Sequence, residues 1–522
     1  MKNQNIKTLI LIIALLLTLA AGAWTYYYAN AFVALPYNDA MDYASMGRNI
    51  NEGRGFTSRY ITPLSLAHFG EPYPNLWRAP LWPLFLAAVF RLFGTSDTAA
   101  VAAGAFFYFG AIIPLFLLAK EISSSKGLSG ETGGTITCIL YIFSPMALFY
   151  SISGMTESMA LFFLVLWALL LYKARGEKYC IFLVTGLVGG LFYLVRYNAL
   201  IFLPLSLLYL WWSGRLKTGG VGKLAAYLGS WLLVVSPWLW RNYTLTGNPF
   251  FSLQAFEPAM FTATYPGYTL YMLPEIINVK TFLLEYPGEI LIKIREGLGS
   301  FRRSMLNPSF TGTAPFMAAL FLPGLLAPMD RKLKIFIATC FFAQLAALLV
   351  IHYIPRLFFI FLPFYLLTAV GLLAYILSFM KSPFLRNAAL AAVVTAALLT
   401  NIPQWHEVNT RQDWPHYYAE AIQDVSRQIS ENGVIISNDG HILSWYADRL
   451  ALKMPVSVKQ IADLEKMAPV EGIWLSNRFR WGNTPEADQQ WLEIMREKPV
   501  ELGNYYLFSA YEDGSLLYLR RQ

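Results

Sequence analysis

The 522-residue chain is 56% hydrophobic and only 14% charged, with a formal net charge of +8. Soluble domains carry about 25% charged residues, so this composition excludes an ordinary soluble protein and indicates a polytopic membrane protein. The basic residues gather in short loops between apolar runs, which is typical of membrane orientation and not of nucleic-acid binding. We therefore expect a lipid bilayer, and no nucleic acid, among the partners.

Apolar runs that are long enough to cross a bilayer, about 20 residues, recur over the first 402 residues. The first run passes into an aromatic segment at 24–28, which predicts an uncleaved anchor, although 21–23 resembles a signal-peptidase site. The stretch 81–94 is short and contains Arg91, so we expect an interfacial helix there. About eleven spans are predicted, at 8–29, 98–119, 134–152, 156–172, 179–196, 199–213, 222–240, 314–328, 333–352, 356–378 and 385–402.

Charge asymmetry predicts the orientation of these spans. With the N-terminus inside, every second connection is short and basic, as the positive-inside rule requires; these connections contain Lys120, Lys173, Arg215, Arg331 and Lys381. The same parity places a first loop (30–97), a second loop (241–313) and a tail (403–522) on the outer face. We predict two domains, a transmembrane module at 1–402 and a soluble extracytoplasmic domain at 403–522.

The tail differs in composition from the rest of the chain. It has a helical run at 416–429 and short strand-like runs at 434–437, 472–476, 505–511 and 515–521. The last two runs are joined by Glu512-Asp513-Gly514, which indicates a hairpin. The tail therefore predicts a small α/β domain.

Charged residues recur at the outer ends of the predicted spans. Lone charges are costly to bury near the hydrocarbon boundary, so a set of them at one depth predicts a site. The set is Asp39, Asp42, Arg78, Glu157, Arg196, Arg241, His352 and Arg356.

This set suits the transfer of a group from a lipid phosphate. Arginines hold a phosphate by charge-assisted, often bidentate hydrogen bonds, and they stabilise the charge on a departing phosphate. The reaction then needs a base to take a proton from an acceptor hydroxyl, and we predict Asp39 as that base. Tyr43 and Trp77 flank the charges and are candidates for contact with sugar or lipid.

No motif for another common chemistry is present. The sequence has no HExxH motif, no P-loop and no complete GxGxxG fingerprint, and its five histidines are scattered. We expect no cofactor and no metal site, because arginines already compensate the charge of a phosphate. A divalent cation held by an Asp and a Glu stays open.

Several motifs together carry a family resemblance. They are Asp39-x-x-x-Tyr43, Gly47-Arg48-Asn49-Ile50, Glu52-Gly53-Arg54-Gly55-Phe56, Arg78-Ala79-Pro80-Leu81, Thr156-Glu157, Trp240-Arg241-Asn242 and the tail phrase at 434–455. With them the chain resembles the GT-C superfamily of membrane glycosyltransferases, in the branch of the protein O-mannosyltransferases and lipid A aminoarabinose transferases (glycosyltransferase family 39-like).

The resemblance implies a polytopic α-helical GT-C fold and an enzyme of the plasma (inner) membrane. Such an enzyme transfers a sugar from a polyprenyl phosphate to a glycan, lipid or protein acceptor, usually with inversion. It implies that Asp39 is the catalytic acid position and Glu157 the second acidic position, and that Arg78 and Arg241 bind phosphate. Ala40 after Asp39, and Arg-Ala-Pro in place of Lys-Pro-Pro at 78–80, depart from the family pattern and leave the donor sugar and the acceptor open.

Plainer interpretations compete with these. Asp39 is also placed to cap a helix, Asp42 to support the site or face solvent, and Glu157 to stabilise the start of the fourth span through the helix dipole. The arginines at span ends are also placed to snorkel. A non-catalytic transporter or flippase of lipid-linked sugars is the alternative function, and a receptor or scaffold a third; transporters tend to show internal repeats and midplane charges, and this sequence shows neither.

Overall fold

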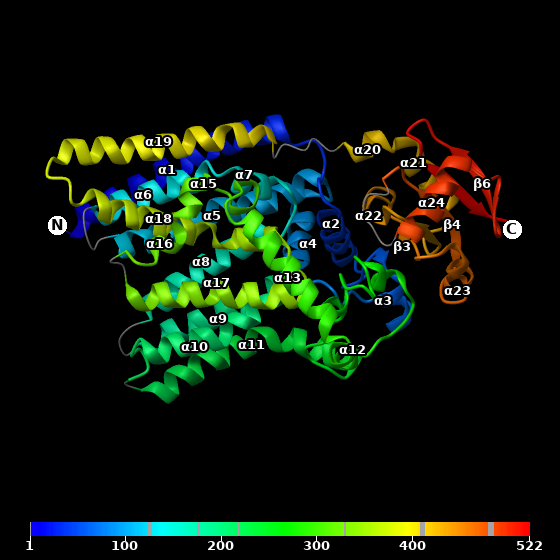
Figure 1. The fold of residues 1–522 in the computed structure, drawn as a ribbon, viewed down its shortest axis with the longest axis horizontal. Coiled ribbons are helices and arrows are strands. Elements are labelled where there is room, and N and C mark those ends of the chain that lie inside the picture. Colours follow the sequence, from blue (N-terminus) through cyan, green and yellow to red (C-terminus); the bar gives the residue numbers. More distant parts are fainter. Residues whose placement is uncertain are drawn as a thin grey trace.

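The computed structural model describes residues 2–123, 128–174, 178–217, 219–327, 330–407, 413–478 and 485–521. Long helices run side by side in one bundle, and a sheet with short helices covers one end of it (Figure 1). The N-terminus lies at the other end of the bundle, far from the C-terminal strand. The predicted class, a helical bundle followed by a C-terminal α/β region, is confirmed.

Five helices in the described part of the chain are long and apolar enough to cross a membrane. They lie within α1 (Lys2–Ala31), α5 (Asp97–Ser123), α17 (Arg331–Ile351), η4 with α18 (Pro355–Phe361 and Leu362–Leu377) and α19 (Pro383–Glu407). All five fall on predicted spans. The chain is thus a multi-pass membrane protein.

None of the other predicted spans forms a single described helix that is both long and apolar enough to cross a membrane, and the count of eleven is not confirmed. Helices α6 (Gly130–Ile142) and α7 (Pro145–Ile152) meet at a bend of 58°, where Pro145 cannot donate a helical hydrogen bond. The remaining helices of the bundle are α8 (Glu157–Lys173), α9 (Tyr179–Val195), η1 (Tyr197–Ile201) with α10 (Phe202–Trp212), and α11 (Gly220–Thr246).

The predicted span at 314–328 is wrong as a single helix. The described residues of this stretch form two short helices, α15 (Pro315–Ala319) and α16 (Phe321–Gly324). Pro323 explains the break, because a proline ring clashes with the carbonyl four residues earlier, here that of Ala319.

The two loops between bundle and sheet contain short elements. The first loop holds α2 (Asn38–Asn51), α3 (Pro63–His68) and α4 (Leu81–Phe93), and the second holds η2 (Leu253–Ala259), η3 (Thr269–Met272), α12 (Val279–Glu285), α13 (Pro287–Ser304) and α14 (Pro308–Thr311). The short helix expected at 81–94 is α4. Residues 40–49 of α2 are all buried, so this helix is packed on every side.

The seven-stranded sheet has the order β1-β3-β2-β4-β7-β6-β5. Its strands are β1 (Tyr60–Ile61), β2 (Val434–Ser437), β3 (Leu450–Lys453), β4 (Val470–Leu475), β5 (Glu501–Leu502), β6 (Tyr505–Ala510) and β7 (Leu516–Arg520), joined by α20 (Trp414–Tyr417), α21 (Ala419–Gln428), α22 (Gly440–Ile442), η5 (Leu443–Ala447), η6 (Val458–Gln460), α23 (Ile461–Glu465) and α24 (Pro485–Glu497). Strands β1 to β4 pair in parallel, and β7, β6 and β5 follow antiparallel.

The sheet is not built by the tail alone. Its edge strand β1 comes from the first loop and pairs with β3, Tyr60 opposite Ala451. The backbone N–H of Ala451 also donates to the carbonyl of Arg59 at 2.8 Å. The first loop and the tail are therefore one hydrogen-bonded unit.

Candidate active site

The site starts at the first two turns of α2. Asp39 lies in the first turn and Asp42 three residues later, so both project from one face of the helix. The cap residue of α2 is Tyr37, and no side chain caps this end. The interpretation of Asp39 as a helix cap is therefore wrong.

Arg78 joins these two carboxylates. Its Nη2 lies 2.7 Å from Oδ1 of Asp39, and its Nε lies 2.8 Å from Oδ2 of Asp42. The guanidinium carbon stands 4.8 Å from the ring centroids of both Tyr43 and Trp77. Arg78 is thus a buried cation between two acids and two aromatic rings, which suits a planar guanidinium better than an ammonium group.

The rest of the site comes from the bundle. Arg356 in η4 pairs with Oδ2 of Asp39, and its Nε lies 4.0 Å from Oε1 of Glu157 at the start of α8. Arg196, which ends α9, lies 2.6 Å from the same oxygen. Three acids and three arginines therefore alternate in one continuous chain, in the order Asp42, Arg78, Asp39, Arg356, Glu157 and Arg196.

At the bundle end of this chain of charges, several buried polar atoms have no hydrogen-bond partner among the described residues. Glu157 is fully buried, and its Oε2 has no hydrogen-bond partner among the described residues; the same holds for Nε of Arg356 and Nη1 of Arg196. Buried polar atoms without partners are rare and mark the places where a water, ion or ligand completes the structure. These atoms are therefore the polar groups at which a water, an ion or a ligand would complete the site.

The pKa values of the two aspartates are shifted in opposite directions. Burial alone would raise the pKa of Asp39, but the charges and hydrogen bonds of Arg78 and Arg356 hold that pKa well below its ordinary value. Burial raises the pKa of Asp42, although Arg78 and the hydroxyl of Ser58 oppose the change. Asp39 is consequently ionised and doubly paired, whereas Asp42 supports Arg78 from behind.

Arg241 does not join the chain of charges. Its Nη2 donates to the backbone carbonyls of Phe56 and Asn75, both at 3.2 Å, and its guanidinium carbon stands 4.5 Å from the Trp238 ring centroid. It therefore holds the first loop against α11. The link to the site is indirect, since the Asn75 side chain accepts a hydrogen bond from the backbone N–H of Arg78 at 2.8 Å.

Other supporting residues have no signal in the sequence. Ser58 donates to Asp42 at 3.0 Å, the Tyr197 hydroxyl donates to the carbonyl of Arg78 at 3.0 Å, and Arg196 donates to the hydroxyl of Thr156 at 2.9 Å. Serine, threonine and tyrosine are common everywhere in the chain, so only their contacts single them out. Two of them stand beside residues that the sequence had marked: Thr156 precedes Glu157, and Tyr197 follows Arg196.

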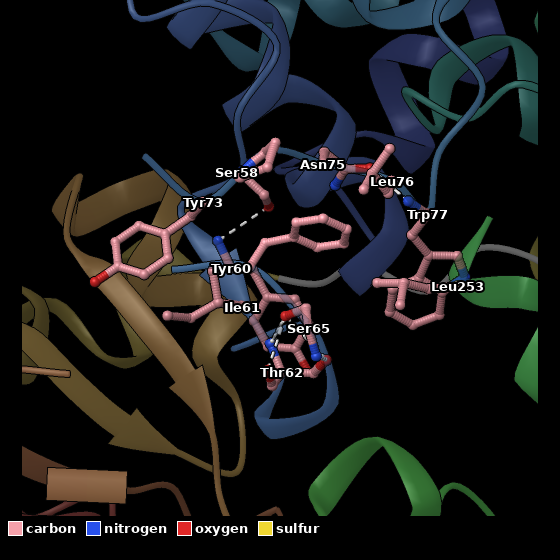
Figure 2. A pocket seen from close by; sticks show the side chains of 12 residues that line it. Ser58, Tyr60, Ile61, Thr62, Ser65, Tyr73, Asn75, Leu76, Trp77 and Leu253 are labelled. Carbon is pink, nitrogen blue, oxygen red and sulfur yellow. Dashed lines mark hydrogen bonds between the residues drawn. The ribbon is translucent and has the colours of Figure 1, made fainter. Parts of the chain in front are cut away.

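A small pocket adjoins the site in the first loop (Figure 2). It shares Ser58 and Trp77 with the surroundings of the charged chain. Its wall combines hydroxyl and amide groups with aromatic rings, from Tyr60, Thr62, Ser65, Phe69, Tyr73 and Asn75 among others. Within the described residues, no three His, Cys, Asp or Glu side chains are grouped as metal ligands.

Comparison with known proteins gives a family match and a fold match. The family model described as dolichyl-phosphate-mannose-protein mannosyltransferase matches residues 77–240, a segment that includes Arg78, Glu157 and Arg196. No curated protein sequence matches the chain.

Among solved structures, the oligosaccharyltransferase of Archaeoglobus fulgidus in complex with Zn and sulfate is similar, with a TM-score of 0.60 and 14% identity over 88% of this chain and 68% of that one. The oligosaccharyltransferase AglB of the same organism, in complex with an inhibitory peptide and a dolichol-phosphate, gives a TM-score of 0.56 and 14% identity over 97% of this chain and 74% of that one. ArnT from Cupriavidus metallidurans gives a TM-score of 0.43 and 12% identity over 99% and 98%. The family model covers about a third of the chain, and the likeness to the oligosaccharyltransferases shows that this chain shares their fold.

Proposed function

We propose that the protein is a glycosyltransferase that moves a sugar from a polyprenyl-phosphate donor to an acceptor hydroxyl, with inversion. The observation that carries the proposal is the alternating chain of acids and arginines, in which Asp39 stands between two cations. The family match to dolichyl-phosphate-mannose-dependent enzymes and the dolichol-phosphate bound by the similar AglB structure support a lipid-linked donor.

The donor phosphate competes with Asp39 for Arg78 and Arg356. Once the phosphate takes up these guanidinium groups, Asp39 loses two counter-charges, and its pKa rises toward that of an ordinary carboxylate. A carboxylate that is paired with two cations is a weak base. Binding of the donor therefore makes Asp39 a stronger base. Asp42 keeps Arg78 in place through the exchange, because it pairs with a different nitrogen of the guanidinium group.

In the transfer step, the acceptor oxygen forms a bond to the anomeric carbon while the bond from that carbon to the phosphate oxygen breaks. The acceptor proton moves to Asp39, and the electron pair leaves with the polyprenyl phosphate, whose charge is held by the arginines. Arg196 completes the cationic set, and the open oxygen of Glu157 accepts a hydrogen bond from the substrate. Tyr43 and Trp77 offer ring faces to sugar or lipid, and Arg241 acts indirectly by holding the first loop.

We further propose that the site and the soluble domain at 403–522 face the extracytoplasmic side of the plasma membrane, as the basic loops predict. Charge compensation comes from arginines, and a divalent cation would be an addition to them. Since the similar oligosaccharyltransferase structure contains Zn and sulfate, transfer is measured with and without a chelator.

The first test is Asp39→Asn in full-length protein, reconstituted in lipid and supplied with polyprenyl-phosphate sugars of several kinds. We expect transfer to fall by about 100-fold or more, because general-base catalysis contributes roughly 10²–10⁴-fold. Binding of polyprenyl phosphate should be kept or strengthened, because Asp39 no longer competes for the arginines. Transfer is followed by release of polyprenyl phosphate, and binding by titration.

A matched control is Glu131→Gln, which removes a carboxylate that pairs with Lys120 at 2.7 Å between α5 and α6, away from Asp39. Its transfer rate should equal that of the wild type. Full transfer by Asp39→Asn would remove the assigned base. Wild-type protein that moves lipid-linked sugar between leaflets but transfers none would establish the transporter instead.

A further inference from the structure

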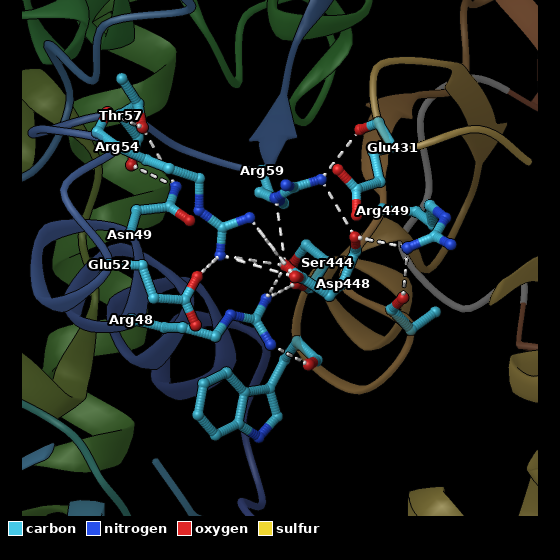
Figure 3. A network of polar contacts seen from close by, with 12 residues as sticks. Arg48, Asn49, Glu52, Arg54, Thr57, Arg59, Glu431, Ser444, Asp448 and Arg449 are labelled. Atoms are coloured by element: carbon cyan, nitrogen blue, oxygen red, sulfur yellow. Dashed lines mark hydrogen bonds and ion pairs between the residues drawn. The ribbon is translucent and has the colours of Figure 1, made fainter. Parts of the chain in front are cut away.

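Three arginines of the first loop converge on one carboxylate of the tail (Figure 3). Asp448 lies 2.6 Å from Nη2 of Arg48, 3.3 Å from Nη1 of Arg54 and 3.1 Å from Nε of Arg59. Arg48 and Arg59 are both buried. Their charges depend on Asp448, because a buried cation without a partner is strongly unfavourable.

The backbone around Asp448 is shaped for this role. The turn η5 ends at Asp448, which takes a left-handed conformation with φ +51°; Asp and Asn adopt it more readily than other side chains. Arg48 also donates to the carbonyls of Ser444 at 2.6 Å and Trp445 at 2.8 Å. The last turn of α2 is therefore held, through Arg48, by the Asp448 carboxylate and two backbone carbonyls of one short tail segment.

The same tail segment is fixed to the bundle. The indole N–H of Trp445 donates to Asp97 at 2.6 Å, and the hydroxyl of Tyr446 donates to the other oxygen of that carboxylate at 2.8 Å. Asp97 begins α5, a helix long enough to span a membrane. Segment 444–448 thus links α2 to α5 through hydrogen bonds and an ion pair.

A short series of contacts leads from Asp448 to the candidate base. Arg59, held by Asp448, is the neighbour of Ser58, and Ser58 donates to Asp42. Asp42 pairs with Arg78, and Arg78 pairs with Asp39. Arg48, at the far end of α2, fixes the helix that carries both aspartates. Asp448 therefore holds the first loop at three points that follow the two aspartates in the chain.

We propose that Asp448 is a positioning residue for Asp39, so that the tail sets the geometry of the site without touching the substrate. The proposal rests on the proposed transferase function. It gives the tail a role in the chemical step, and it assigns that role to one residue. Arg356 and Arg196 belong to the bundle and keep their places when Asp448 changes.

The test uses Asp448→Asn in the full-length protein. Asparagine keeps the left-handed backbone and one acceptor oxygen, so the variant removes the charge and replaces the second acceptor oxygen by an amide donor. We expect kcat to fall by about 10-fold or more, since small displacements of a catalytic group cost up to about 100-fold. KM for the donor should change by less than about two-fold, and hydrogen exchange over 38–61 should become faster. Asp463→Asn, which breaks an exposed pair with Lys466 in the same tail, should leave all three quantities unchanged.

A double-mutant cycle separates positioning from general loss of stability. Arg59→Gln alone should lower kcat, and adding Arg59→Gln to Asp448→Asn should cost less than the two single effects together, because the unpaired arginine is gone. If Asp448→Asn does not fold, Arg54→Gln removes the most exposed of the three arginines and should show a smaller fall in kcat at constant KM.

Unchanged kcat and unchanged exchange in a folded Asp448→Asn would overturn the inference, as would strictly additive effects in the cycle. Failure of the proposed function looks different, because the wild type itself would then transfer no sugar from any donor. An equal loss of kcat and of donor binding in Asp448→Asn would assign the network a purely structural role and also overturn the inference.

Discussion

At the scale of single residues, Arg78 fixes the positions of the two aspartates in the alternating row of acids and arginines. Its Nε and Nη2 address two different carboxylates, and its backbone is fixed by Asn75 and Tyr197. Breaking a buried pair by removing one partner costs about 3–5 kcal/mol, so Asp39 and Asp42 both depend on this one side chain. The guanidinium therefore serves as both a scaffold and a phosphate-binding group in the proposed reaction.

His441 makes the stability of the folded protein depend on pH. Its ring stacks on Tyr60 at 3.6 Å, and burial lowers its pKa to about 3, with smaller effects from Asp39, which raises it, and from Arg78 and Lys453, which lower it. The unfolded histidine titrates near 6.5. Its folded pKa is therefore depressed, and the protein loses stability as the pH falls from about 6.5 toward about 3, since only the unfolded state takes up the proton.

We expect His441→Phe to remove this loss. The phenyl ring keeps the stacking contact with Tyr60 but binds no proton. The melting temperature of the variant should therefore fall less steeply than that of the wild type between pH 7 and pH 4. Melting curves in detergent at several pH values measure the two slopes. Parallel curves would show that His441 does not titrate on unfolding.

At the scale of elements, α9 and α11 pack closely enough to require a glycine. A Cβ at Gly186 of α9 would overlap with the carbonyl oxygen of Tyr227 and with the hydroxyl of Ser230. The same two helices lead into the site, because α9 ends at Arg196 and Trp238 of α11 donates to the Tyr197 hydroxyl at 2.9 Å. Their spacing is therefore part of the site's geometry.

Gly186→Ala should lower the melting temperature and the transfer rate together. Overpacking typically costs about 1–3 kcal/mol, more than the gain of about 1 kcal/mol in helix propensity. Gly229→Ala on α11 is the matched control, since nothing lies within 4 Å of its Cβ position, and this variant should be at least as stable as the wild type. A Gly186→Ala variant as stable as Gly229→Ala would contradict the close packing.

Local sequence patterns predicted some elements of the fold and missed others for a physical reason. The run at 434–437 is β2, and the hairpin signal at 512–514 joins β6 to β7. Strands β1, β3 and β5 were not predicted. For β1 the reason is that a strand of two residues has no pattern of its own, and its partner β3 lies nearly 400 positions away. The same holds for the Arg48–Asp448 pair: patterns of 2 or 3.6 residues report which face is buried, and they do not report what covers it.

For the candidate site, the predicted topology identified which residues lie close together more accurately than it identified the partners of each side chain. Placing the ends of the spans on one face was enough to group Asp39, Arg78, Glu157, Arg196 and Arg356. Arg241 satisfied the same rule but turned toward loop carbonyls, because depth in the membrane fixes one coordinate and leaves the direction of a side chain open. The supporting hydroxyls lay beyond sequence reasoning for the same reason.

At the scale of the whole molecule, the tail lies at the same end of the bundle as α2, the helix that carries Asp39 and Asp42 (Figure 1). Arg356 begins the η4–α18 span, and Lys381 follows α18 at its other end. A span that crosses the bilayer places these two ends in different compartments. Whichever side the tail occupies, the site must share it, because segment 444–448 and β1 bind the two together.

Cysteine labelling therefore determines the orientation of the site and the tail in one experiment. Cys138 and Cys340 are buried, and Cys180 is exposed, so Cys180→Ser gives a background in which added cysteines are read alone. Asp463→Cys reports on the tail and Lys381→Cys on the opposite end; both positions are exposed. With the basic loops inside, a membrane-impermeant maleimide should label Asp463→Cys while the membrane is intact, and Lys381→Cys only after it is opened. The reverse pattern would place the site on the cytoplasmic side, and labelling of both before opening would contradict a span at 355–377.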